Sequence, residues 1–315
     1  YNHFWRFWND AENDRNGFVP LFIPYWEIPG RDAAWAEEQR RMLGELKFNQ
    51  EVLCNFLGSS LTLIRADVIA KMTVDQPIYQ KDGLDCYVRP QKNHTYCMTV
   101  DIAEGVGGDY STFQVVDITE APYRIVAKFR KNDITPLLFP NVIHKVATEY
   151  NKAFVLIEIN MSEQVAQILH QELEYDNILM VNRTAGSQVV GGGFGGGKSY
   201  LGVSTDKRVK RVGCHNFKAM VEENKLLITD PDTISEISTF IEKRSSYEAD
   251  EGYHDDLVMP LVLFGWLTTQ SYFKELNNIN MRKIMYEKQM QAIEEELTPF
   301  GFYDDGKPEA DPLNF

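Results

Sequence analysis

The sequence predicts an α/β fold in which helices flank a mixed central β-sheet. Three segments with strand-like alternation follow one another at residues 95–102, 112–118 and 123–130. After them the pattern changes to helix, strand, helix, strand, which is typical of parallel strands joined by helical crossovers. The chain has 315 residues, of which 43% are hydrophobic, and this is enough to build a substantial core around such a sheet.

The first 90 residues are predicted to be peripheral to this sheet. Residues 18–26 are apolar and rich in proline, which favours an extended chain, and residues 33–46 have the pattern of an amphipathic helix. The chain starts without Met and without a secretory signal pattern, so we expect a fragment of a longer protein, with residues 1–60 as the end of a preceding domain. Residues 61–90 are expected to be a linker or peripheral segment, because proline and glycine interrupt them.

The main domain is predicted to span residues 91–275. Its fourth strand is expected at residues 154–159 and its fifth at 178–181. The predicted helices cover residues 136–150, 163–173, 206–223 and 233–243, with a last helix from Asp255. Three strands followed by alternating helix and strand match the ribonuclease H-like architecture of the RuvC and integrase type. Residues 276–315 are expected to form a charged helix and a mobile tail, because the tail has too low a density of apolar residues to fold alone.

Composition limits the classes of function. The four cysteines show no C-x-x-C pair, which argues against a zinc site and a disulfide framework and fits a reducing cytoplasm. The longest apolar run is shorter than the roughly 20 residues of a membrane span, so no membrane association is expected. The formal net charge of −14 argues against tight unaided DNA binding, because neutralisation of phosphates supplies most of the affinity that does not depend on sequence.

Four acidic residues are expected at the ends of predicted elements. Asp101 ends the first strand, Glu158 ends the fourth, and Asp255 and Asp256 open the last helix. Carboxylate oxygens are preferred ligands of hard cations, so one or two Mg²⁺ or Mn²⁺ ions are expected there. Such ions activate water against a phosphodiester, and the sequence therefore predicts a metal-dependent nuclease. The alternatives are a solvated carboxylate at a strand end for Asp101 and a helix cap for Asp255 and Asp256.

Further polar residues surround these acids in the sequence. We expect Glu104, Asp109 and His254 to lie next to the metal ligands, or to be turn and structural residues. A basic run is expected to follow a DNA backbone, or else to be a solvated helix face; its members are Lys207, Arg208, Lys210 and Arg211, with Lys198 as a weaker candidate.

Residues 192–199 satisfy the pattern G-x-x-x-x-G-K-[ST] of a phosphate-binding loop. Such a loop normally leads directly into a helix, whereas residues 200–205 are β-branched and interrupted by glycine. A loop near the DNA path or a flexible connection is the preferred interpretation of this segment.

Four segments resemble the large terminase subunit of T-even-like tailed bacteriophages. They are residues 98–111 around Asp101, 155–160 around Glu158, 191–198 in the glycine-rich loop, and 251–259 around Asp255 and Asp256. The resemblance implies a nuclease domain of ribonuclease H-like fold, preceded in residues 1–60 by the end of an ATPase domain that has lost its Walker motifs. No ATPase activity is therefore expected.

The same resemblance implies the biological role. The domain would cut concatemeric viral DNA, with little sequence preference, when packaging starts and when the head is full. The implied partners are double-stranded DNA, the portal protein, the small terminase subunit and the chain's own ATPase domain, in the host cytoplasm on the procapsid. Asp101 and Glu158 would be two catalytic acids, and the third would be Asp255 or Asp256. Many family members carry another Asp one turn later, where this chain has Met259.

Three other functions remain open at the level of the sequence. A structure-selective resolvase or integrase-type nuclease would prefer branched DNA over linear duplex. A P-loop motor would bind ATP through Lys198, and a non-catalytic module that docks on a portal would keep the acids without nicking DNA.

Overall fold

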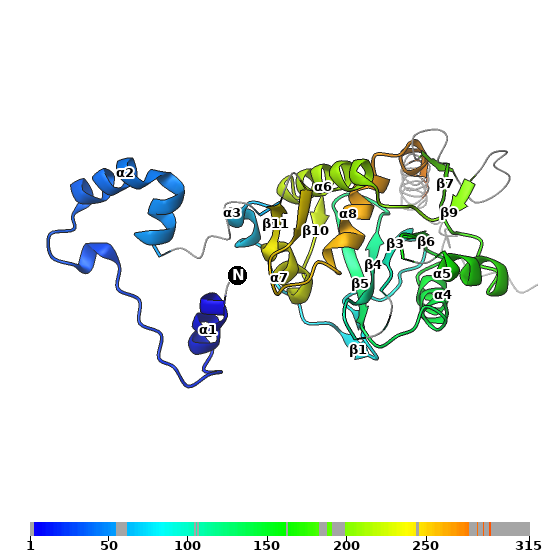
Figure 1. Ribbon diagram of the computed structural model, residues 1–315, viewed down its shortest axis with the longest axis horizontal. Coiled ribbons are helices and arrows are strands. Elements are labelled where there is room, and N and C mark those ends of the chain that lie inside the picture. Colours follow the sequence, from blue (N-terminus) through cyan, green and yellow to red (C-terminus); the bar gives the residue numbers. More distant parts are fainter. Residues whose placement is uncertain are drawn as a thin grey trace, which may run out of the picture.

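The computed structural model describes residues 3–54, 62–103, 105, 107–161, 163–182, 188–190, 199–243 and 246–276, together with residues 282, 286 and 290. Its centre is a mixed seven-stranded sheet (Figure 1) with the strand order β1-β2-β5-β4-β3-β6, to which β10 adds beside β5. The strands are β1 (Tyr79–Lys81), β2 (Leu84–Cys86), β3 (Tyr96–Asp101), β4 (Ser111–Asp117), β5 (Tyr123–Lys131), β6 (Phe154–Ile157) and β10 (Leu226–Leu227). β3 and β6 pair in parallel, as do β10 and β5, and the remaining pairs are antiparallel. The predicted mixed sheet is confirmed.

The sheet is buried on both faces, because side chains alternate along each strand. On β3, Met98 and Val100 belong to one hydrophobic core, while Cys97 belongs to the other. Thr99 and Asp101 share the face of Cys97, since they follow it at intervals of two residues.

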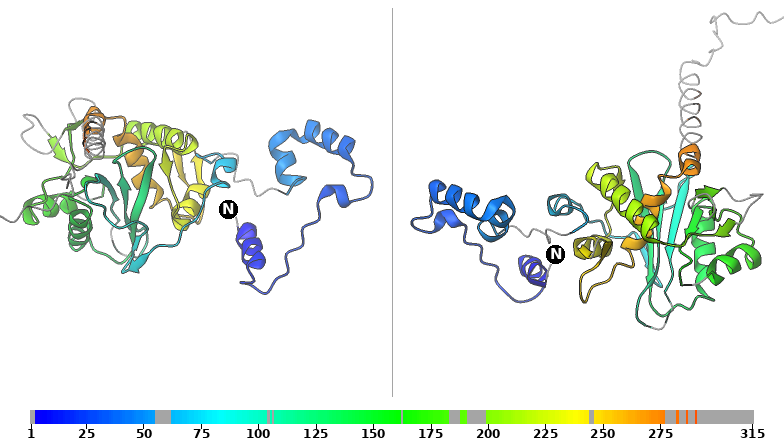
Figure 2. Two further views of the ribbon diagram at one scale, coloured as in Figure 1. Left: turned by 180° about the vertical axis from the view of Figure 1, so that it is seen from behind. Right: turned by 45° about the horizontal axis from the view of Figure 1, so that its top comes forward.

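Helices cover the two faces in separate layers, as Figure 2 shows. The core that contains Met98 is closed by α4 (Phe139–Glu149) and α5 (Gln164–Gln167), which continues as the π-helical turn η2 (Ile168–Glu172). The core that contains Cys97 is closed by α6 (Lys207–Glu222), α7 (Pro231–Thr239) and α8 (Val258–Leu267). Every residue of α8 is buried, as expected for a helix that is apolar on all sides.

Two glycines let α6 and α8 approach each other closely. A Cβ atom on Gly265 would lie 2.5 Å from the carbonyl oxygen of Gly213, and one on Gly213 would lie 2.3 Å from that of Val262. Both distances are shorter than any side chain tolerates, so this helix crossing requires glycine. The crossing fixes α8, and with it the acidic residues that precede α8.

The chain outside the predicted central elements differs from expectation in three places. The sequence predicts one helix over residues 233–243, but α7 ends at Thr239 and β11 (Phe240–Lys243) pairs with β12 (Ser246–Ala249). Phe240 is buried, so packing of this residue overrides the weak helical pattern. The last helix starts at Val258 rather than Asp255, and a small sheet forms from β7 (Met180–Asn182), β8 (Gln188–Val190) and β9 (Ser199–Leu201).

Residues 62–90 are part of the main body. β1 is an edge strand of the central sheet and β2 lies between β1 and β5. Leu63, Ile64 and Ile69, the last in α3 (Ala66–Ile69), are buried in the core of the α6 to α8 layer. The segment expected to be a linker or peripheral segment therefore holds a hairpin at one edge of the sheet and residues of its core. The predicted division of the chain into four segments stays a prediction.

Residues 3–54 form α1 (His3–Glu12), η1 (Tyr25–Glu27) and α2 (Ala33–Glu51), which are drawn beside the sheet in Figure 1. The predicted extended segment lies between α1 and η1, and it exposes Phe18, Val19 and Leu21. Among the described residues, no helix combines the length and the apolar character needed to cross a bilayer.

Candidate active site

The parallel pairing of β3 and β6 brings Asp101 and Glu158 together. Val100 lies opposite Ile157 in the register, and the next residue on each strand carries the acid. The backbone N–H of Glu158 donates to the carbonyl of Val100 over 2.9 Å, which extends the pairing to the acids themselves. The side chains of Asp101 and Glu158 share a hydrogen bond. Two carboxyl groups in contact require a shared proton or a cation between them.

Asp255 and Asp256 approach the same point from the loop before α8. Both raise the pKa of Asp101 through their negative charge, Asp256 more than Asp255. Burial is the largest cause of that increase, followed by the charge of Glu158, and together they hold the pKa of Asp101 well above its ordinary value. The four predicted acids are therefore close enough to interact electrostatically, although three segments of sequence supply them.

The two neighbouring aspartates have different surroundings. Asp255 accepts a hydrogen bond from the backbone of Ala249, and the positive charge of Lys210 partly offsets the effect of burial on its pKa. Asp256 is 7% exposed, and its Oδ2 atom is buried without a hydrogen-bond partner among the described residues. Burial raises the pKa of Asp256 to about 6, although a hydrogen bond from the Tyr110 backbone and the charge of His254 lower it in part. The Nδ1 atom of His254 lies 3.4 Å from the Oδ2 atom, which is too long for a strong hydrogen bond. A buried carboxylate oxygen without a hydrogen bond fits a metal ligand, so Asp256 suits this role better than Asp255.

A pocket of about 460 Å³ opens over three of these acids, and the buried Glu158 is not part of its lining. Asp101, Asp255 and Asp256 line it together with Asp109 and Tyr110 from the turn after β3. Asp109 and His254 are exposed, and with Asp256 they offer ligand atoms that all lie within 4.8 Å of one another. The structure thus places Asp109 and His254 beside the acids, whereas Glu104 lies outside the described residues.

Glu158 is linked to the start of α6. Its Oε1 atom accepts a hydrogen bond of 2.8 Å from the amide of Asn160, which also donates to the carbonyl of Thr205 over 3.2 Å. Thr205 lies just before the N-cap of α6, Asp206, which accepts from the Val209 backbone. This arrangement places the first turns of α6 at the acidic end of the sheet.

Those first turns carry the predicted basic run. Lys207, Arg208 and Arg211 are exposed, and we call these three residues the α6 basic cluster. Lys210 faces inward instead, with its amine 5.8 Å from the centre of the Phe240 ring and its charge acting on Asp255. Lys198 and the glycine-rich residues 191–197 lie outside the described residues.

A second group of carboxylates shows the contrast between a paired and an unpaired site. Asp85, Asp230 and Asp232 surround Lys128, whose amine lies 3.4, 2.7 and 2.5 Å from them. The Lys128 side chain is 2% exposed, so these acids already have a buried cation from the protein. Among the described residues, no lysine or arginine forms a salt bridge with Asp101, Glu158, Asp255 or Asp256, and Asp256 has the imidazole of His254 at 3.4 Å.

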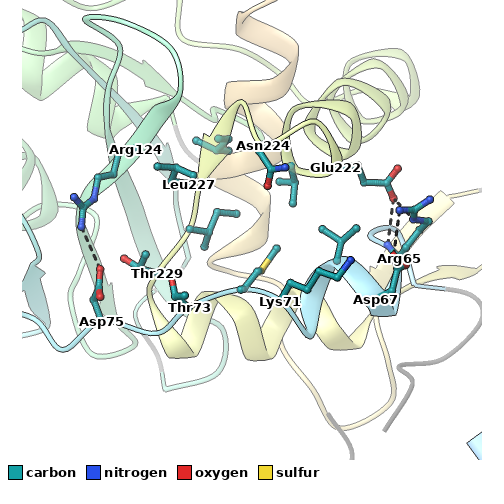
Figure 3. A pocket seen from close by; sticks show the side chains of 15 residues that line it. Arg65, Asp67, Lys71, Thr73, Asp75, Arg124, Glu222, Asn224, Leu227 and Thr229 are labelled. Carbon is teal, nitrogen blue, oxygen red and sulfur yellow. Dashed lines mark hydrogen bonds and ion pairs between the residues drawn. The ribbon is translucent and has the colours of Figure 1, made fainter. Parts of the chain in front are cut away.

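A further pocket, of about 430 Å³, lies at the other end of the sheet. Arg124 lines this pocket and pairs with Asp117 in the sheet, and Asp117 pairs with Tyr96. Tyr96 is the first residue of β3 and Asp101 is the last, so the two pockets lie at opposite ends of this strand. Figure 3 shows that its arginines are paired with acids, Arg124 with Asp75 and Arg65 with Glu222. None of the predicted site residues lines this pocket, so it is separate from the candidate active site.

Several buried polar residues near the acids were missed in the sequence. They are the buried Thr112 and Gln114 on β4 and Glu236 on α7, together with the partly buried Arg130 on β5. The available signal was a polar residue at every second position of an otherwise apolar strand, which marks one face as carrying buried polar groups.

Comparison with known proteins identifies the fold. The family model described as "Terminase RNaseH-like domain" matches residues 98–271, more than half of the 315 residues. The chain is also similar to the crystal structure of the large terminase nuclease from thermophilic phage G20c with bound magnesium, with a TM-score of 0.51 and 17% identity, over 66% of this chain and 97% of that chain. The corresponding structure with bound cobalt gives a TM-score of 0.50 at 17% identity, with the same coverage. At this identity the two structures show the fold, and the predicted ribonuclease H-like architecture is confirmed.

Proposed function

The chain belongs to the terminase RNase H-like domain family, and we propose that it is the metal-dependent endonuclease that cuts concatemeric phage DNA during packaging. Cuts are made when packaging starts and when the head is full, with little sequence preference. Low preference follows if the protein contacts phosphates, because phosphates carry no base information.

One observation carries this proposal. The Asp101 and Glu158 carboxyl groups are in contact, and a third carboxylate, that of Asp256, has a buried oxygen without a hydrogen bond, with the His254 imidazole 3.4 Å away. Buried charges of one sign are costly unless a cation pairs with them. The proposed donors are carboxylates, and hard divalent cations such as Mg²⁺ or Mn²⁺ prefer such oxygens. Asp109 and His254 lie beside Asp256 and offer further ligand atoms.

The residues then have distinct roles. Asp101, Glu158 and Asp256 hold one or two cations, and Asp255 adds negative charge from the same loop. A bound divalent cation supplies a water of lowered pKa and neutralises charge that develops on the phosphate. Asn160 fixes the orientation of Glu158 through its hydrogen bond, and the exposed imidazole of His254 lies 3.4 Å from the Asp256 carboxylate.

The α6 basic cluster is proposed to contact the DNA backbone, since it starts at the acidic end of the sheet. The net charge of −14 keeps intrinsic DNA affinity low. Cutting then depends on the partners that bring DNA to the site, for which we propose an ATPase domain, a small terminase subunit and the portal, at the procapsid in the host cytoplasm. We further propose that the chain itself hydrolyses no ATP.

Nicking of supercoiled plasmid tests the proposal. The native chain should relax and linearise the plasmid with Mg²⁺ or Mn²⁺ and should be inactive in EDTA. Asp101→Asn and Glu158→Gln should abolish nicking while remaining folded, and Asp133→Asn, an exposed acid outside the pocket, is the matched control with full activity. Metal-dependent nicking that both pocket variants retain would contradict the assignment of these acids.

A further inference from the structure

A row of residues crosses the sheet in register with Asp101. Asp101 on β3 pairs with Thr112 on β4, and Thr112 pairs with Arg130 on β5. Residues paired in this way point to the same face of a sheet. The face is the one covered by α7 and α8, because Phe113 and Val115 point to the opposite core.

Thr112 holds one side of the peptide bond between Asp256 and Leu257. Its hydroxyl donates to the carbonyl oxygen of Asp256 over 2.5 Å, and Thr112 is fully buried. A backbone carbonyl in this layer has no access to water, so removal of its donor leaves a costly unpaired group.

Glu236 holds the other side of the same peptide bond. Its Oε2 atom accepts from the N–H of Leu257 over 2.7 Å, and its Oε1 atom lies 3.1 Å from the guanidinium of Arg130. Glu236 is 6% exposed and reaches this position from α7. Arg130, the third residue of the row, therefore acts on the peptide bond through Glu236.

Gln114 adds a contact from the next row. Its amide donates to the Thr233 hydroxyl on α7 over 3.0 Å and to the carbonyl of Leu257 over 3.4 Å. The backbone on both sides of the Asp256–Leu257 bond is thus held by side chains of β4 and α7. We call Thr112, Arg130 and Glu236 the peptide clamp.

A polar network in an apolar layer needs an explanation beyond stability. Apolar residues of similar shape can fill such a layer without a decrease in stability, whereas directed hydrogen bonds to both sides of one peptide bond fix its geometry. Here the geometry fixed is that of Asp256 relative to Asp101, because both residues are tied to the same cross-strand row.

We infer that the peptide clamp positions Asp256 for the reaction, so that Thr112, Arg130 and Glu236 are positioning residues of the nuclease. This inference rests on the proposed function. The clamp fixes the backbone of Asp256, while the side chain of Asp256 remains free to bind a cation.

The test compares two substitutions of the same kind. Thr112→Val removes the hydroxyl that holds Asp256 and keeps the shape of the side chain. Thr99→Val is the control: Thr99 is fully buried on the neighbouring strand, and its hydroxyl has no hydrogen-bond partner among the described residues. Thr112→Ser restores the hydroxyl and should restore the native behaviour.

Two quantities are measured at a temperature at which all variants are folded by circular dichroism. They are the Mn²⁺ affinity, by titration calorimetry with Mn²⁺ alone, and kcat and KM for plasmid cleavage. Thr112→Val should weaken Mn²⁺ binding or lower kcat by about 10-fold to 100-fold, the range for residues that orient metal ligands, with KM for DNA unchanged. Thr99→Val and Thr112→Ser should match the native protein.

The outcomes separate the clamp from the function on which it rests. If the native protein binds Mn²⁺ and cuts DNA while Thr112→Val matches Thr99→Val, the clamp is overturned and the proposed function stands. If the native protein neither binds Mn²⁺ nor cuts, the proposed function is overturned, and the clamp with it.

Discussion

Replacing Asp256 with Asn should stabilise the metal-free protein at pH 8. The reason is that the Asp256 carboxylate is buried among other acids, and burial raises its pKa from 3.8 to about 6. A carboxyl group with a higher pKa in the folded state holds its proton more tightly there than in the unfolded chain. The buried Asp256 carboxylate therefore does not destabilise the protein below about pH 4. Its destabilising effect grows as the pH rises and is complete above about pH 6.

The size of the effect follows from the pKa shift. An increase in the pKa of Asp256 from 3.8 to about 6, at 1.36 kcal/mol for each pH unit, lowers the free energy of unfolding at pH 8 by about 3 kcal/mol at most. For a domain of this size, 1 kcal/mol changes Tm by about 2–4 °C, so Asp256→Asn should raise Tm by up to about 10 °C. Asn has nearly the same shape as Asp, so packing should be unchanged.

Thermal unfolding in EDTA at pH 5 and pH 8 measures this difference. The Tm advantage of Asp256→Asn should be large at pH 8 and smaller at pH 5. Asp133→Asn is the matched control, because the Asp133 side chain is 69% exposed and should give no advantage at either pH. Addition of Mn²⁺ should then raise the Tm of the native protein more than that of Asp256→Asn, since binding to the folded state stabilises it. An Asp256→Asn variant with a Tm equal to or below the native value at pH 8 would refute this reasoning.

Three further predictions concern an ion pair, a helix crossing and the DNA path. Asp230→Asn should change stability in the opposite direction from Asp256→Asn. It should destabilise the protein by about 3 kcal/mol or more in urea unfolding, because it removes a negative charge next to the buried amine of Lys128. An unchanged unfolding midpoint would show that this ion pair does not contribute to stability. Gly265→Ala should lower the free energy of unfolding by about 3 kcal/mol, at the upper end of overpacking costs, because the added Cβ meets the backbone of α6. Gly108→Ala is the control and should leave stability unchanged, because Gly108 is exposed and its added Cβ meets nothing within 4 Å. Replacing the residues of the α6 basic cluster with Gln should make binding of duplex DNA less dependent on salt. The slope of the logarithm of the binding constant against the logarithm of the salt concentration should decrease by up to about 0.9 for each phosphate that is no longer neutralised. An unchanged slope in filter binding would show that the cluster does not contact DNA.

Much of the sheet could be predicted because its strands carry simple signals. β3, β4 and β5 lie within one or two residues of their predicted positions, since alternating or continuous apolar runs end at clear turn residues. The convergence of Asp101 and Glu158 also follows from the parallel pairing of two strands that both end in an acid. The metal-binding role of the four acids stays a prediction, although the structure brings them to one place.

The parts that sequence missed depend on tertiary contacts. The sequence does not distinguish Asp255 from Asp256, because most of their difference arises from Ala249, Lys210 and the Tyr110 backbone, which other segments supply. The neighbouring His254 adds to the difference through its contact with Asp256. The hairpin of β11 and β12 was missed because burial of Phe240 decides its conformation. Thr112 and Glu236 are ordinary polar residues in the sequence, and their contact with one peptide bond appears only when β4, α7 and the α8 loop are assembled.

Anomalous diffraction from crystals soaked in Mn²⁺ tests most directly whether Asp101, Glu158 and Asp256 form a cation site at the end of β3 and β6. We expect an anomalous peak within coordinating distance of the Asp101 and Asp256 carboxylates, which disappears in crystals of Asp101→Asn. A well-occupied Mn²⁺ peak elsewhere, with none between these carboxylates, would contradict the assignment.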